Sequence, residues 1–295
     1  MSDTETPERQ ISPVLSRAIV LAVLVTLCLI AYGVMLARFD MAKGPAEVEL
    51  GAPSGEAQVR LYLQPTHIDP VNHAIQLRIN LLPGSAAPDD TMIADRSYIL
   101  RIRRGEQVEQ IAVKAGQPLP EATFEFDLER GNVRDYPFDR YVSSTVLSAS
   151  ALTEDGTDHP LAIRAKAWEG LFGFTVEVQA RPASHRDELA LESSFSRTGA
   201  VAFFSLAIYG AMFVVAICAL VIGSLVFVGT RKIEVPFVGA LGAMIFALPV
   251  LRNALPGAPP LGVRADALIF FWAELGAIVG LCLFIVAWAR RGAAP

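Results

Sequence analysis

Two patterns of apolar and polar positions divide this chain. Four stretches are apolar almost without interruption, and the first of them, AIVLAVLVTLCLIAYGVMLA, holds 20 residues between Arg17 and Arg38. A helix rises about 1.5 Å per residue and the hydrocarbon core of a bilayer is about 30 Å thick, so this stretch is long enough to cross a membrane. Residues 17–38 are therefore predicted to form a transmembrane anchor.

Three further apolar stretches lie in the last third of the chain. They cover residues 199–229, 235–251 and 266–289, and Pro236 stands in the first turn of the middle one, where its missing N–H costs little. The chain is thus predicted to cross the membrane once before and three times after a segment of different character.

That segment, residues 40–197, alternates apolar and polar positions with a period of two. QVRLYL places Val59, Leu61 and Leu63 on one face, and about eight such short runs are separated by Gly, Pro, Asn and Asp. This pattern predicts an antiparallel β-sandwich. The expected fold class is a β + α membrane protein, with an extracytoplasmic sandwich, one N-terminal and three C-terminal transmembrane helices.

Basic residues predict the orientation, because Lys and Arg near the ends of spans favour the cytoplasm. Arg231 and Lys232 separate the second and third spans, and Arg290 and Arg291 follow the fourth. Both places are therefore predicted to be cytoplasmic. An even number of spans returns the N-terminus to the same side.

The two tails, residues 1–16 and 290–295, are accordingly expected in the cytoplasm of a multi-pass plasma-membrane protein. The sandwich and the Pro-rich segment 252–265 are expected outside. Arg252 and Arg264 lie in that outer segment and argue against this orientation, but the basic residues of the cytoplasmic side outnumber them.

Composition and charge narrow the choice of partners. The chain is 53% hydrophobic, which is high for a soluble protein. Residues 40–197 hold 24 Asp and Glu against 16 Lys and Arg, so 24 − 16 leaves eight net negative charges. An acidic surface repels the phosphate backbone, so the lipid bilayer is an expected partner and nucleic acid is not.

A tight group of aromatic and charged residues interrupts the strand pattern. RDYPFDRY, residues 134–141, is predicted to be a loop, because Pro137 fixes its own φ and favours an extended Tyr136. Two interpretations remain open: a structural corner that closes one end of the sandwich, and a contact loop that touches the membrane helices or a partner. The candidate contact residues are Tyr136, Pro137, Phe138, Asp139, Arg140 and Tyr141.

Two resemblances involve this octet. YPFDRY, with LRNALPGAPPLGV at residues 251–263 and FFWAEL at 270–275, resembles the bacterial membrane proteins of domain-of-unknown-function family 4436 over most of the chain. This resemblance implies the arrangement of one span and then three, and it implies no activity. Residues 136–139 alone are similar to the turn that couples the sandwich to the helices in pentameric ligand-gated ion channels. Those channels place all four spans after the sandwich, so the likeness implies a membrane-facing loop more than conduction.

Glu274 is a carboxylate inside the predicted fourth span. It follows Asp266 by eight positions, which is about 12 Å along a helix. A charge inside a membrane is costly, so we expect a partner, and Arg252 or Asn253 at the end of the third span is the candidate. Two interpretations of the Glu274 and Arg252 pair remain open: a structural ion pair or protonated carboxyl, and a proton or ion pathway.

Signatures of common enzymes are absent from the sequence. It contains no GxSxG, GxxxxGK[ST], HExxH or GxGxxG motif, and it suggests no catalytic residue, metal ligand or cofactor. The predicted function is a non-enzymatic envelope adaptor or partner-binding protein, and a subunit of an oligomeric channel or transport assembly is the alternative. An envelope protein and further copies of the chain are the possible protein partners.

Overall fold

A computed structural model divides the chain into two compact units, residues 1–43 and residues 44–295. The residues whose structure is described are 19, 22–23, 25–27, 29–34, 37, 46–53, 57–83, 92–151, 159–183, 185 and 187–291.

The first unit contains the predicted anchor. Its described residues are helical, and most of them belong to the apolar stretch Val25–Val34. The other residues of the anchor predicted at 17–38 lie outside the described part of the chain, as does the predicted tail 1–16.

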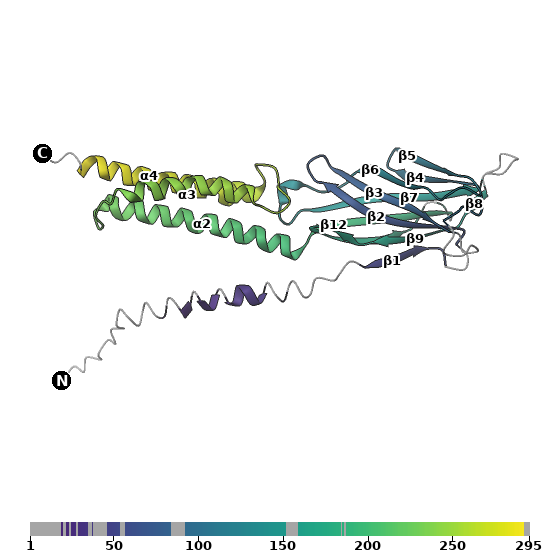
Figure 1. The fold of residues 1–295 in the computed structure, drawn as a ribbon, viewed down its shortest axis with the longest axis horizontal. Coiled ribbons are helices and arrows are strands. Elements are labelled where there is room, and N and C mark those ends of the chain that lie inside the picture. Colours follow the sequence, from purple (N-terminus) through teal and green to yellow (C-terminus); the bar gives the residue numbers. More distant parts are fainter. Residues whose placement is uncertain are drawn as a thin grey trace, which may run out of the picture. The chain divides into compact units, whose positions relative to one another are not determined.

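The second unit begins with two β-sheets that face each other (Figure 1). The five-stranded sheet has, in spatial order, β1 (Glu47–Gly51), β9 (Ile163–Trp168), β2 (Val59–Asp69), β3 (Ala74–Leu82) and β6 (Glu121–Asp127). The seven-stranded sheet has, in spatial order, β10 (Gly170–Leu171), β11 (Phe174–Arg181), β12 (Glu188–Arg197), β7 (Arg140–Ala151), β4 (Tyr98–Arg104) and β5 (Gln107–Val113), with β8 (His159–Leu161) beside β7.

Strand direction matches the prediction with one exception. The paired strands of the described chain run antiparallel apart from β2 and β9, which run parallel from Val59 opposite Ile163 to Leu63 opposite Ala167. The predicted sandwich is confirmed, and its purely antiparallel character is corrected at this pair. Alternation fixes which face of a strand is buried but says nothing about the direction of its neighbour.

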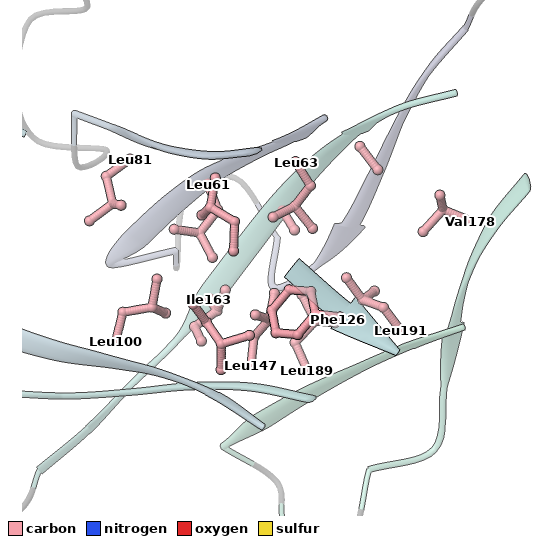
Figure 2. Packing of buried hydrophobic residues seen from close by; sticks show 14 of the residues in the cluster. Leu61, Leu63, Leu81, Leu100, Phe126, Leu147, Ile163, Val178, Leu189 and Leu191 are labelled. Carbon is pink, nitrogen blue, oxygen red and sulfur yellow. The ribbon is translucent and has the colours of Figure 1, made fainter. Parts of the chain in front are cut away.

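The inward faces of both sheets form one hydrophobic core (Figure 2). Leu61 and Leu63 of β2 meet Leu147 of β7 across the two layers, with Phe126 of β6 beside them. Burying one such side chain contributes about 1.5–3 kcal/mol. Polar side chains also occupy core-facing positions on the seven-stranded sheet: Arg104, Ser143 and Thr145.

Three helices follow the sandwich and are long and apolar enough to cross a membrane. They are α2 (Gly199–Val228), α3 (Pro236–Asn253) and the segment Asp266–Arg291, which begins as the π-helix η2 (Asp266–Phe270) and continues as α4 (Phe271–Arg291). Their ends lie within two residues of the predicted limits. Thr198 caps α2, because its Oγ1 accepts a hydrogen bond from the Val201 N–H at 3.4 Å.

The three helices lie side by side, and α2 and α4 approach each other through glycine (Figure 1). A Cβ atom added to Gly223 would lie 2.1 Å from the Gly280 carbonyl oxygen, and one added to Gly280 would lie 2.4 Å from the Ala219 carbonyl oxygen. Only glycine allows the two backbones to come so close, as is common among transmembrane helices.

Candidate functional site at the junction

The octet 134–141, here called the junction loop, lies where the sandwich meets the helices. It begins within the short 3-10 helix η1 (Val133–Asp135) and continues into β7. Tyr136, Asp139 and Tyr141 are buried, whereas Phe138 is 65% exposed. Pro137 is buried and Arg140 is exposed. The buried and exposed side chains therefore divide the loop into two groups with different surroundings.

Tyr136 joins the sandwich to the helices. Its hydroxyl lies 2.5 Å from Ser205 Oγ on α2 and donates a hydrogen bond to the Pro256 carbonyl oxygen at 2.8 Å. Pro256 belongs to the loop between α3 and η2, residues 254–265, here called the Pro-rich loop. Burial raises the pKa of the Tyr136 hydroxyl, and the hydrogen bond with Ser205 acts in the opposite direction. The junction loop therefore contacts both the first helix and the connection between the other two.

Asp139 and Arg197 form a buried ion pair beside Tyr136. The Arg197 Nε lies 3.1 Å from Asp139 Oδ2, and that oxygen also accepts a hydrogen bond from the Tyr141 hydroxyl at 2.8 Å. The guanidinium carbon of Arg197 lies 4.3 Å from the ring centre of Phe174 and 5.4 Å from that of Tyr136. Burial, followed by the hydrogen bond to Asp139, raises the pKa of the Tyr141 hydroxyl.

Arg197 has a special position in the chain. It is the last residue of β12, and α2 begins at Gly199, so only Thr198 separates strand from helix. The ion pair with Asp139 therefore holds the very point at which the chain passes from the sandwich into the helices. Within the octet, Asp139 and Tyr141 bond to each other, Asp139 pairs with Arg197 at the end of β12, and Tyr136 contacts Ser205 of α2.

A second buried polar cluster lies at the ends of the helices nearest the sandwich. Arg252 Nη2 of α3 lies 2.8 Å from Asp266 Oδ2 of η2, and it also donates a hydrogen bond to the Pro260 carbonyl oxygen at 2.7 Å. Asp266 further accepts hydrogen bonds from the Tyr209 hydroxyl at 2.9 Å and from the Gly262 N–H at 3.0 Å. The cluster thus connects all three helices.

The predicted pair of Glu274 with Arg252 is wrong, because Arg252 pairs with Asp266. The Pro-rich loop brings the start of η2 back to the end of α3, whereas Glu274 lies eight residues further along the helix, or about 12 Å away. The Oε2 atom of Glu274 is buried and forms no hydrogen bond with the described residues.

The two clusters are connected on one face of α2. Ser205 belongs to the first and Tyr209 to the second, and residues four apart lie on the same face of a helix. At the surface, Arg264 of the Pro-rich loop lies 2.7 Å from Asp135. Sequence reasoning missed Ser205, Tyr209 and Asp266, although the spacing of the first two was a signal for a polar stripe along the second span.

The chemistry of the junction is that of a structural connection. Its buried aspartates pair with arginines, and its buried hydroxyls bond to neighbouring oxygens. Among the described residues, no group of three or more His, Cys, Asp or Glu side chains is arranged to hold a metal ion. These contacts join the sandwich to the helices.

Two family models match the chain. The model described as "Domain of unknown function (DUF4436)" matches residues 48–193, which span β1 to β12, and the model described as "Domain of unknown function (DUF8686)" matches residues 197–291, which contain the three helices. A search of curated proteins finds no match. The boundary between the two matched segments coincides with the strand-to-helix connection at Arg197.

Proposed function

We propose a role for this chain from the contacts at the junction, because the chain belongs, through residues 48–193, to the DUF4436 family of domains of unknown function and no activity comes with that family. The protein is a non-enzymatic adaptor of the cell envelope, whose sandwich binds or positions a partner in a fixed orientation above the plasma membrane. The observation that carries this proposal is the buried ion pair of Asp139 and Arg197 at the strand-to-helix connection.

A fixed orientation is what distinguishes an adaptor of this kind from a domain on a flexible tether. Only Thr198 lies between β12 and α2, so there is no linker in which the sandwich could swing. Tyr136 adds a contact to the Pro-rich loop, which connects α3 to η2. Both features support a sandwich and bundle that act as one body.

The arrangement of basic residues supports cytoplasmic ends for the helices on the side away from the sandwich. Arg231 and Lys232 follow α2, and Arg290 and Arg291 end α4. A Cβ atom added to Gly229, just after α2, would lie 2.5 Å from an Arg291 side-chain nitrogen. The basic residues of two separate segments therefore gather at one end, as the preference of Lys and Arg for the cytoplasm requires.

The two arginines that argued against this orientation have acidic partners. Arg252 pairs with Asp266 and Arg264 pairs with Asp135. Pairing reduces the charge that each presents to the membrane surface. The opposite end, whose basic side chains form no ion pair with a described residue, therefore remains the better candidate for the cytoplasmic side. The sandwich is then external, and an even number of spans places tail 1–16 in the cytoplasm.

Exposed aromatic side chains support contact with the outer surface of the bilayer. Phe138 of the junction loop and Phe172, between β10 and β11, are both exposed at the end of the sandwich where α2 begins. The 30 residues of α2 extend about 45 Å, which matches a bilayer with its headgroups. The two rings then lie at headgroup level, where aromatic residues are favoured.

A subunit of an oligomeric channel or transport assembly remains the second candidate, and Glu274 favours it. Its buried, unbonded carboxylate oxygen lies in a helix that crosses the membrane, which is typical of proton or ion pathways. In a ring of copies this side chain would have to face the shared axis. In the adaptor it has no transport role.

The mass of the detergent-solubilised full chain, with the detergent subtracted, separates the two candidates. We expect a monomer or dimer that carries a second protein after mild crosslinking. A symmetric ring of about four or five copies would contradict the adaptor and favour the channel.

A variant tests, in the same experiment, whether capture of the partner depends on the orientation of the sandwich. Asp139→Asn breaks the ion pair with Arg197 and should reduce capture of the second protein, because the sandwich loses its fixed orientation. Arg181→Met serves as the matched control, since Arg181 lies on the exposed surface of β11 and, among the described residues, pairs with Glu192. Equal capture by Asp139→Asn, Arg181→Met and the unmodified chain would contradict the role of orientation.

A further inference from the structure

Three buried arginines differ in their partners. Arg197 and Arg252 each pair with an aspartate that is completely buried, Asp139 and Asp266. Arg104, at the end of β4, is only 5% exposed and forms no ion pair with a described residue. Buried charges in proteins are normally paired, so Arg104 is the exception that requires an explanation.

Arg104 uses only part of its hydrogen-bonding capacity. Its Nη2 donates a hydrogen bond to Ser143 Oγ on β7, and its guanidinium carbon lies 4.8 Å from the ring centre of Phe126. The Nε and Nη1 atoms are buried and have no hydrogen-bond acceptor among the described residues. Two donors of a cationic group are therefore available to a ligand.

The charge on Arg104 persists at neutral pH. Burial lowers the pKa of its guanidinium to about 10, and the more distant carboxylates of Glu129 and Asp127 act in the opposite direction. Glu129 itself bonds to the N–H and hydroxyl groups of Ser144. A neighbouring anion would offset the cost of burying this cation.

A cavity between the two sheets adjoins this side chain. Its volume is about 30 Å³, and its polar lining comes from Arg104, Ser143, Thr145 and Ser193. This space suits one small ion or one or two water molecules. It is far below the roughly 300 Å³ of a site for an organic ligand.

The sequence places these polar groups together through strand alternation. On β4 the core-facing positions end with Arg104, and on β7 Ser143 and Thr145 occupy core-facing positions. Ser193 lies on β12, and β12, β7 and β4 are consecutive strands of one sheet. Three neighbouring strands thus each contribute a polar side chain to one place in a core that is otherwise apolar.

We propose that Arg104, with the hydroxyls of Ser143 and Thr145, binds a single small monovalent anion of the size of chloride inside the sandwich. The anion neutralises the buried guanidinium and accepts hydrogen bonds from its Nε and Nη1 atoms. Because the anion pairs with a charge that has no ion-pair partner among the described residues and is buried between the two sheets, it stabilises the folded sandwich. This site is independent of the junction and of the proposed adaptor role.

Chloride dependence of unfolding tests the site in the full chain. Thermal unfolding in detergent is followed while chloride rises from about 1 mM to about 300 mM and sodium gluconate keeps the ionic strength constant. We expect a saturable rise in the melting temperature of about 3 °C, because a ligand that binds only the folded state stabilises it. Bromide should give a similar rise.

Arg104→Met removes the charge at similar length and should abolish this chloride dependence, whereas Arg181→Met on the surface should keep it. A melting temperature that follows ionic strength alone, or an Arg104→Met chain that still responds to chloride, would overturn the proposal.

Anomalous scattering from bromide in crystals of the unmodified chain gives a readout that does not depend on a variant. We expect a peak within hydrogen-bonding distance of the Arg104 guanidinium. Density there that fits only water would contradict the proposed anion site.

Discussion

Two fully buried aspartates, Asp139 and Asp266, organise the polar groups where the sandwich meets the helices. Asp139 binds Arg197 and Tyr141, and Asp266 binds Arg252 and Tyr209. A buried ion pair with all its hydrogen bonds contributes little net stability, but loss of one partner leaves an unpaired charge and costs much more. Single substitutions at the junction should therefore have large effects.

Asp266→Asn should destabilise the helical bundle by about 3–5 kcal/mol, because Arg252 would keep its charge without a counter-charge. Unfolding of the purified chain in mixed micelles measures this change. Glu274→Gln is the matched control on the same helix, and it should change stability by less than about 0.5 kcal/mol, since no bond of Glu274 Oε2 is lost. Similar losses for the two variants would show that Asp266 has no special role.

Tyr136→Phe should weaken the attachment of the sandwich by about 1–2 kcal/mol. The variant keeps the ring against Arg197 but leaves the Pro256 carbonyl oxygen without its donor. Amide hydrogen exchange should become faster in the first turns of α2 and in the Pro-rich loop. Tyr62→Phe, in a half-buried position on β2, should leave exchange there unchanged, and unchanged protection in Tyr136→Phe as well would contradict the role of this hydroxyl.

Among the elements, α2 and α4 depend most on close contact. The backbone of Gly223 lies against that of Gly280, so the two helices bring Tyr209 of one beside Asp266 at the start of the other. Helix packing thus sets the distance at which the polar cluster can form.

Gly280→Ala should destabilise the bundle by about 1–3 kcal/mol, because the new Cβ would lie 2.4 Å from a backbone oxygen and the helices would have to separate. Thermal unfolding in detergent is the measurement. Gly242→Ala on α3 makes the same chemical change where nothing lies within 4 Å, so it should be neutral or slightly stabilising. Equal effects of the two alanines would mean that helix propensity, rather than contact, decides the outcome.

At the scale of the whole molecule, the sandwich and the helices from residue 44 onward form one compact unit. The proposed orientation places one end of the sandwich at the membrane surface and the other end in solvent. Phe172 lies at the first end, beside the start of α2, and Met92 is exposed near the opposite end of β7.

A nitroxide at Phe172→Cys, in a chain without its three native cysteines, should collide more often with oxygen than with a water-soluble nickel complex in lipid nanodiscs. The ratio of the two collision frequencies reports the depth of the label in the membrane. We expect the depth of the headgroups, because Phe172 lies beside the first turn of α2. The same label at Met92→Cys should show full access to the nickel complex. Two labels with equal aqueous access would contradict contact between this end of the sandwich and lipid.

The class of the protein could be predicted from the sequence because it depends on local periodicity. Continuous apolar runs indicate spans and alternation indicates strands, and each signal is contained within about 10 to 30 neighbouring residues. The helices Gly199–Val228 and Pro236–Asn253 therefore lie within two residues of their predicted limits. The buried aromatic and acidic residues of the octet were also visible as an unusual cluster.

Which residues meet was decided only by the tertiary structure. Nothing in the local pattern makes β9 run parallel to β2, because a strand with one buried face looks the same in either direction. Arg252 pairs with Asp266 and not with Glu274, because the Pro-rich loop brings the start of η2 back to the end of α3. Arg104, Ser143 and Ser193 are far apart in the chain, and only the order of β12, β7 and β4 brings them to one cavity. Periodicity thus determined the elements, and contacts between distant segments, which leave no local trace, determined the sites.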